Sequence, residues 1–413
     1  MSRKHLGFLR ASVKEGAVHL RAYKATPAFN ARESVNLFEA IRVFRKEETG
    51  FEFGNDYAEY FDGLSHHDAD LIFEGPLTPG NKRKFTYVDR DAKMGSTYAY
   101  WMAPAQGEPS GPAAVKIRDH EVWWPYEKVV AAIAALQAKH PEMVQVETVG
   151  HTVRRRPIQA VRVGSGKRVV ALVGAVHSGE SGPELILPAL EALLAQHAPL
   201  LSKIAVLAVP EVNADERERE VEGVPWYLRT NANGVDINRN FPVDWDTTEY
   251  GYGLESSDPD ASTYRGAAPA SEPETQALMD CLSRHRPVAV FACHCLASIC
   301  GACFLAPRCG KDDAPYAARC SELGTAYAVG MAPELLEHQA VRFGTTSGSL
   351  AAWCYRELAA PAFDIEISGA EKEALAKCRV DKTDRALLAD YQHRHLNGLL
   401  ALLAKIAAED NKG

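Results

Sequence analysis

From about residue 120 onward, short apolar runs alternate along the chain with longer amphipathic stretches, and this alternation constrains the fold more than any other feature. The apolar runs predict buried strands at Ile158–Val163, Val169–Val176, Ile204–Val209, Val288–Cys293, Gly301–Ala306 and Ala362–Ile367. The amphipathic stretches predict helices at Tyr126–Lys139, Pro183–His197, Glu272–His285, Ala314–Val329 and Asp381–Ala408. Strands that are apolar on both faces need cover on both faces. We therefore predict an α/β domain over residues 120–413, with a mixed, largely parallel twisted sheet and helices on both faces.

Residues 1–119 have a different pattern, of short alternating segments separated by turn residues. The segments lie at Gly16–Lys24, Asn36–Lys46, Asp70–Gly75, Lys84–Asp89, Ser96–Met102 and Ala113–Arg118. Such a series predicts an all-β sandwich. The stretch from Lys84 to Trp101 resembles the end of a fibronectin type III module, in which a tyrosine after a glycine turn holds a corner between strands. Tyr98 is the candidate for that tyrosine, and we predict a separate N-terminal sandwich domain.

Composition and charge exclude some classes of function. The chain of 413 residues has a net charge of -8 and no long basic stretch, so we expect no nucleic-acid partner. Charged residues interrupt the first twenty positions, and no later segment is apolar over the length of a bilayer. We therefore expect no secretory signal, no membrane partner and a cytoplasmic location.

The nine cysteines lack the spacing of a small disulfide framework. Five of them crowd one stretch, namely Cys293, Cys295, Cys300, Cys303 and Cys309. Reduced thiols in a cytosolic protein are one interpretation, and a structural zinc site built on Cys300 and Cys303 is the alternative. The pattern does not decide whether this cluster is reduced, bridged or metal-bound.

Three polar residues at the ends of predicted strands form a candidate metal site. His177 and Glu180 follow the apolar run that begins at Val169, and His294 ends the run that begins at Val288. Ligands gather where the strands of an open α/β sheet end, and zinc accepts imidazole and carboxylate donors together. Taken singly, His177 and Glu180 also fit a polar turn before a helix, and His294 fits a structural histidine.

Five ordered segments resemble the zinc carboxypeptidase family, the metallopeptidases of the carboxypeptidase A type. They are Thr148–Ile158, Gly174–Glu180, Gly234–Phe241, Tyr264–Glu274 and Phe363–Ile367. The resemblance spans roughly residues 120–408, and it implies one catalytic Zn²⁺ per chain, held by His177, Glu180 and His294, with an open position for water. It also implies that Glu366 is the general base in the hydrolysis of an amide bond.

The same resemblance implies roles for a second group of residues. Asn238 and Arg239 would bind a terminal carboxylate of the substrate, and Arg229 would stabilise the oxyanion. Asp236 would orient His177 through its second ring nitrogen. The leaving part of the peptide or amide substrate would then carry a free carboxylate. Without the resemblance, this segment also fits an Asn/Gly-rich surface turn.

The sequence departs from the digestive members of the family in the specificity loop. Aligning Trp353 places Gly344 where those members carry a tyrosine, and places Ala351 at the position that sets the pocket's preference. We therefore expect no preference for Lys or Arg. Three functions stay open: a metallocarboxypeptidase, an amidohydrolase or deacylase acting on a peptidoglycan stem peptide, a glutamyl side chain or an N-acyl amino acid, and a catalytically inactive binding protein.

Overall fold

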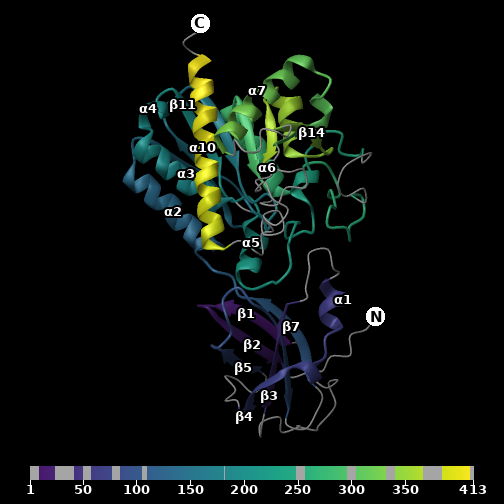
Figure 1. The fold of residues 1–413 in the computed structure, drawn as a ribbon. Coiled ribbons are helices and arrows are strands. Elements are labelled where there is room, and N and C mark those ends of the chain that lie inside the picture. Colours follow the sequence, from purple (N-terminus) through teal and green to yellow (C-terminus); the bar gives the residue numbers. More distant parts are fainter. Residues whose placement is uncertain are drawn as a thin grey trace. The chain divides into compact units, whose positions relative to one another are not determined.

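A computed structural model gives the fold of the chain (Figure 1). The structure describes residues 9–23, 41–49, 57–76, 84–104, 109–180, 182–247, 256–294, 304–331, 340–365 and 384–409. Within these residues, contacts divide the chain into two compact units. One unit comprises Met1–Trp123 with Arg219–Tyr227, and the other comprises Trp124–Glu218 with Leu228–Gly413. The predicted boundary at residues 119–120 stays a prediction.

The N-terminal unit contains two small antiparallel sheets. The strand order of the first is β1-β2-β5 and that of the second is β4-β3-β6-β7. The strands are β1 (Leu9–Lys14), β2 (Ala17–Tyr23), β3 (Ile41–Glu48), β4 (Asp70–Gly75), β5 (Lys84–Asp89), β6 (Thr97–Pro104) and β7 (Ser110–Lys116), and a short helix α1 covers Tyr57–Asp62. One cluster of buried side chains draws on both sheets, with Val18 and Leu20 from the first and Val43, Tyr100 and Val115 from the second.

The second unit is built on an eight-stranded mixed sheet of order β14-β13-β15-β12-β10-β11-β9-β8. Its strands are β8 (Val144–His151), β9 (Pro157–Val163), β10 (Arg168–Val173), β11 (Ile204–Val209), β12 (Ala289–Cys293), β13 (Phe304–Pro307), β14 (Val341–Thr345) and β15 (Ala362–Ile365). Four of its seven strand pairings are parallel and three are antiparallel. The predicted α/β class with a mixed sheet is confirmed.

Helices cover this sheet. They are α2 (Tyr126–Lys139), α3 (Pro183–Gln196), α4 (Ala198–Leu201), α5 (Ala214–Val221), α6 (Pro273–His285), α7 (Ala314–Met331), α8 (Leu350–Trp353) and α10 (Arg385–Glu409). Every residue of the central strands β11 and β12 is buried, so both faces of the sheet centre are covered, as the apolar runs predict. The long α10, yellow in Figure 1, packs against α3 and α7. Among the described residues, no helix combines the length and apolar character needed to cross a membrane.

The topology brings the polar ends of several strands to one edge of the sheet. Strands β11, β10, β12 and β15 are successive parallel neighbours, so their carboxyl ends point the same way. His177 follows β10, His294 follows β12, and Asp364 is the second-to-last residue of β15. This arrangement is the one in which open α/β sheets place their ligands.

Candidate metal centre

A tightly folded loop after β10 carries His177 and Glu180. Ala175 in this loop has a φ of 47°, a left-handed conformation that is uncommon for a residue with a side chain. A Cβ on Gly174 would lie 2.6 Å from Cα of Gly182 and 2.4 Å from the carbonyl oxygen of Pro210. Only glycine permits this close approach of the backbones, which fixes the path of the loop.

His177, Glu180 and His294 converge on one point. Oε2 of Glu180 lies 2.9 Å from Nδ1 of His177 and 2.9 Å from Nδ1 of His294. All three side chains are buried, and one ligand atom from each lies within 4.8 Å of the other two. Two imidazole nitrogens and one carboxylate form the donor set of a catalytic zinc site.

A carboxylate lies behind each of the two histidines. Nε2 of His177 lies 2.9 Å from Oδ1 of Asp236, and Nε2 of His294 lies 3.2 Å from Oδ1 of Asp364. Asp236 accepts a hydrogen bond, which holds the ring proton of His177 on Nε2 and leaves its Nδ1 free to coordinate, whereas Asp364 faces His294 as an ion-pair partner. Asp236 is the residue for which the sequence suggests this orienting role, whereas the contact of Asp364 with His294 was not predicted.

The charges of the cluster call for a cation at its centre. Burial alone would raise the pKa of Glu180, but His177 and His294 hold it below its ordinary value. Burial alone would likewise lower the pKa of His294, yet Asp364 and Glu180 raise it well above its ordinary value. Three buried carboxylates, those of Glu180, Asp236 and Asp364, therefore surround the two imidazoles and need positive charge beside them. A divalent cation between the Nδ1 atoms and Glu180 would supply that positive charge, so the residues present fit a zinc ion.

Arg217 on α5 holds the metal-binding loop in place. Its side chain is fully buried, and Nη1 donates to the carbonyl oxygens of Ser178, at 3.0 Å, and Glu180, at 2.7 Å. Its Nη2 donates to the carboxylate of Glu184. Sequence reasoning missed this residue, because its helix is rich in charged side chains and resembles a solvated surface helix.

Asp236 also organises the segment that follows it. Its Oδ2 accepts a hydrogen bond from Nε of Arg229 at 2.7 Å, and its Oδ1 accepts one from the backbone N–H of Asn238 at 2.9 Å. Burial alone would raise the pKa of Asp236, but Arg229 and His177 lower it. Arg229 and the predicted metal ligand His177 therefore contact the same carboxylate, that of Asp236.

The structure places Asn238 and Arg239 in a buried turn. The Asn238 amide donates to Oδ2 of Asp364 at 3.1 Å and accepts from the backbone N–H of Leu350 at 2.9 Å. Nη1 of Arg239 donates to the carbonyl oxygen of Asn238 at 2.9 Å. Asn238 thus links the metal centre to α8, and its role in substrate binding stays a prediction.

Of the remaining residues singled out in the sequence, the structure describes Ala351 and Gly344 but not Glu366. Ala351 on α8 is 1% exposed and belongs to the same buried cluster as Trp353. Gly344 lies in β14, and among the described residues a Cβ there would touch the side chain of Leu305 alone, while its alignment with the family's tyrosine stays a prediction. Glu366 lies outside the described residues, directly after the end of β15.

The cysteine cluster is only partly described. Cys293 and Cys309 carry free thiols, as do the described cysteines elsewhere in the chain, Cys281, Cys320 and Cys354. Cys295, Cys300 and Cys303 lie outside the described residues, so the alternative of a structural zinc site there stays open.

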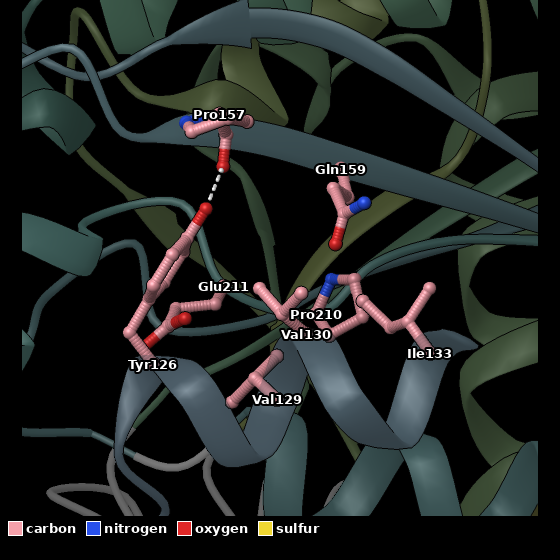
Figure 2. Close-up of a pocket in the computed structure, with 8 residues that line it drawn as sticks. All are labelled: Tyr126, Val129, Val130, Ile133, Pro157, Gln159, Pro210 and Glu211. Carbon is pink, nitrogen blue, oxygen red and sulfur yellow. Dashed lines mark hydrogen bonds between the residues drawn. The ribbon is translucent and has the colours of Figure 1, made fainter. Parts of the chain in front are cut away.

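A small pocket involves none of these residues (Figure 2). Its lining residues come from α2, from β9 and from the end of β11, and they are Tyr126, Val129, Val130, Ile133, Pro157, Gln159, Pro210 and Glu211. Both carboxylate oxygens of Glu211 lack a hydrogen-bond partner among the described residues. Burial is the main cause that raises the pKa of Glu211 to about 8, and the negative charge of the nearby Glu184 adds to this effect.

Comparison with known proteins gives three findings. The sequence profile described as zinc carboxypeptidase matches residues 129–383, more than half of the chain. Mast cell carboxypeptidase A of Rattus norvegicus is 27% identical over 185 residues, which are 39% of this chain and 42% of that protein. Murein peptide amidase A of Escherichia coli (strain K12) is 42% identical over 76 residues, which are 18% of this chain and 31% of that protein.

A solved structure supports the fold. Carboxypeptidase A from Helicoverpa armigera superimposes with a TM-score of 0.59 and 17% sequence identity, covering 91% of this chain and 99% of that one. The chain spans less than half the length of the two curated relatives above. The comparisons therefore establish the family and the fold, and leave the activity and the substrate open.

Proposed function

Because the chain belongs to the zinc carboxypeptidase family, we propose that it is a metallocarboxypeptidase that hydrolyses an amide bond next to a free carboxylate in a peptide. The observation that carries this proposal is the buried convergence of His177, Glu180 and His294, with one ligand atom of each within 4.8 Å of the others. A cluster with intact ligands also argues against an inactive binding protein, the third function left open by the sequence.

The proposed roles combine the family resemblance with the positions of the described side chains, and Glu366 is assigned from the sequence alone. His177, Glu180 and His294 would hold one zinc ion, which when bound acts as a Lewis acid and lowers the pKa of a bound water. Asp236 would keep the imidazole of His177 in the coordinating tautomer, and Asp364 would pair electrostatically with the imidazole of His294. Glu366 would accept the proton of the attacking water and pass it to the leaving amine.

Arginine residues close to Asp236 support the part of the proposal that concerns the carboxylate. Arg229 would stabilise the oxyanion, and Arg239, with Asn238, would bind the free carboxylate of the substrate through its guanidinium. Arg239 is 7% exposed.

A second candidate is hydrolysis of an amide in a non-protein substrate such as a peptidoglycan stem peptide. The local match to murein peptide amidase A favours it, as do Gly344 and Ala351, which differ from the digestive pattern. A side-chain glutamyl link or an N-acyl amino acid would require the same metal centre. Both candidates predict an uncharged or acidic leaving residue, because Ala351 offers no carboxylate to a Lys or Arg side chain.

Matched substrates separate these proposals. The zinc-loaded protein should hydrolyse short peptides with a free C-terminal carboxylate at least about tenfold faster, in kcat/KM, than the same peptides as C-terminal amides. Arg239→Ala should remove most of that preference, whereas Arg394→Ala, at a partly exposed ion pair with Asp390 on α10, should not. Equal rates on acid and amide would refute the carboxylate requirement. Turnover only of stem peptides or N-acyl amino acids would select the second candidate.

We also propose that the N-terminal unit is a fibronectin type III-like sandwich. Supporting this, the backbone N–H of Lys93 donates to the hydroxyl of Tyr98 at 3.1 Å, and Tyr98 is 2% exposed. A tyrosine hydroxyl bonded to the backbone a few residues upstream is the device of immunoglobulin-like sandwiches. The shared core of the two sheets is a second supporting feature. We expect this unit to supply no metal ligand.

A further inference from the structure

A second cluster of metal-binding side chains lies on α6 and β8. Glu147 on β8 and Cys281 and His285 on α6 each offer one ligand atom, and these three atoms lie within 4.8 Å of one another. Cys281 is fully buried, whereas Glu147 and His285 are partly exposed. Within the described part of the chain, only this cluster and the catalytic one bring three such side chains together.

The packing of α6 on β8 produces this cluster. Ala277, Cys281 and His285 are spaced four residues apart, so they share one face of the helix. Ala277 lies so close to β8 that a Cβ on Gly150 would come within 2.5 Å of the Ala277 Cβ. One and two turns further along, the same face brings Cys281 and His285 against Glu147.

The cluster is separate from the catalytic centre. Strands β10, β11 and β9 lie between β12, which leads to His294, and β8, which carries Glu147. Neighbouring strands are about 4.8 Å apart, so the two strands lie roughly 19 Å from one another across the sheet.

We propose that Glu147, Cys281 and His285 bind a second divalent cation, of the thiophilic kind that includes Zn²⁺ and Cd²⁺. The donors are one sulfur, one imidazole nitrogen and one carboxylate oxygen, a mixture that zinc accepts and that magnesium and calcium do not prefer. Binding displaces the Cys281 thiol proton to solvent and places two anionic donors on a dication. The occupied site is therefore electrically neutral, provided that His285 coordinates as neutral imidazole.

The geometry requires only a small adjustment. Donor atoms around a tetrahedral zinc ion lie about 3.3 to 3.6 Å apart. Nε2 of His285 is now 2.8 Å from Oε1 of Glu147, in a direct hydrogen bond that an ion would replace. Because the side chains of Glu147 and His285 are 36% and 21% exposed, small rotations about their side-chain torsions can separate the two donor atoms by the ~0.5 Å that the ion requires.

Two features of the cluster oppose metal binding, and each predicts an effect that can be measured. Burial is the main cause that raises the pKa of the Cys281 thiol to about 12, and the charge of Glu147 adds to this effect. The thiol is therefore protonated in the absence of an ion. Binding should therefore release a proton and become tighter as pH rises. Arg284 donates to Oε2 of Glu147 at 2.8 Å and places a positive charge beside the site. Removing Arg284 should therefore tighten binding.

Cadmium titration of the zinc-loaded full chain tests the proposal. The thiolate of Cys281 should give a sulfur-to-cadmium charge-transfer absorbance in the ultraviolet, together with about one additional metal equivalent by equilibrium dialysis. Cadmium exchanging into the catalytic centre adds no such band, because its ligands there are histidine and glutamate. Cys281→Ser should lose the band attributable to this site and weaken binding by at least about tenfold.

Matched variants complete the test. Cys320→Ser removes another buried helical thiol and should leave the titration unchanged. His285→Gln, at a partly exposed position, should weaken binding like Cys281→Ser and covers the case in which the buried serine disturbs folding. Arg284→Ala should tighten binding roughly two- to fivefold. An unchanged titration in both Cys281→Ser and His285→Gln, or no equivalent beyond the catalytic one, would overturn the proposal.

Discussion

Oδ1 of Asp236 lies 2.9 Å from Nε2 of His177, on the side of the imidazole ring opposite the nitrogen that faces Glu180. The other oxygen of the same carboxylate accepts from Arg229. Asp236 therefore contacts both Arg229, the proposed oxyanion-stabilising residue, and His177, a proposed metal ligand. Its charge should affect both residues.

Asp236→Asn should weaken zinc binding. The amide keeps the size of the side chain but removes the negative charge that holds the proton on Nε2 of His177. Partners of this kind contribute about 10- to 100-fold in metal affinity or activity. Competition with a chelator measures the affinity, and Asp390→Asn, at a surface ion pair on α10, serves as the control. Affinities for Asp236→Asn and Asp390→Asn that agree within error would contradict the role of Asp236.

Glu366→Gln should stop turnover and leave the metal in place. The substitution removes a proton acceptor without removing a ligand, so we expect a loss in kcat of about 100-fold or more. Zinc content and the thermal unfolding midpoint, measured on the same preparation, should match the unmodified protein. Activity within a few-fold of that protein would mean that the base lies elsewhere, and loss of zinc would mean that Glu366 is a ligand.

Arg217→Met should destabilise the metal-binding loop. The variant keeps much of the buried volume but leaves Glu184 without its guanidinium partner and the carbonyl oxygens of Ser178 and Glu180 without their donor. Breaking a buried ion pair of this kind costs about 3–5 kcal/mol. Denaturant unfolding gives the free energy directly. Lys139→Met, at an exposed ion pair with Glu191, should cost about 1 kcal/mol or less.

Glu211→Gln should stabilise the protein increasingly as pH rises. The folded state holds the Glu211 proton up to about pH 8, whereas the unfolded chain releases it near its ordinary pKa of 4.5. Between these values the folded state binds more protons, so the free energy of unfolding falls as pH rises. Glutamine lacks this penalty while filling the same pocket beside Tyr126 (Figure 2).

Thermal unfolding at about pH 5 and about pH 8 checks this prediction. The gain in melting temperature for Glu211→Gln should be larger at the higher pH. Glu191→Gln, at an exposed ion pair with Lys139, should show no such increase. A gain that stays constant across the range would show that Glu211 does not bind its proton more tightly in the folded state.

The centre of the fold was predictable because its signals are local. The apolar run Ile204–Val209 coincides with β11, and Tyr126–Lys139 coincides with α2. Strands at the edges, such as β8 and β14, were not predicted, since their exposed polar residues hide the apolar pattern. The run from Val169 was expected to reach Val176 but β10 ends at Val173, because Gly174 and Ala175 turn into the metal-binding loop.

The predicted metal ligands do lie together, but the contacts that support them depend on tertiary structure. His177 and Glu180 are close in sequence and His294 ends an apolar run, so strand ends sufficed to nominate them. Arg217 sits in a helix whose sequence is that of a solvated surface, and only the fold buries it. Likewise, Asp364 meets His294 only because β12 and β15 are parallel neighbours.

Zinc content measured alongside activity decides whether His177, Glu180 and His294 hold a catalytic zinc ion. The unmodified protein, after dialysis against metal-free buffer, should retain about one tightly bound zinc that supports hydrolysis, whereas His177→Ala and His294→Ala should each lose both zinc and turnover. If the second site on α6 and β8 also retains an ion, all the proteins compared should carry Cys281→Ser, so that this site adds nothing to the measured zinc content. Full occupancy of the tight site in either histidine variant, or undiminished hydrolysis after zinc is removed, would contradict the account.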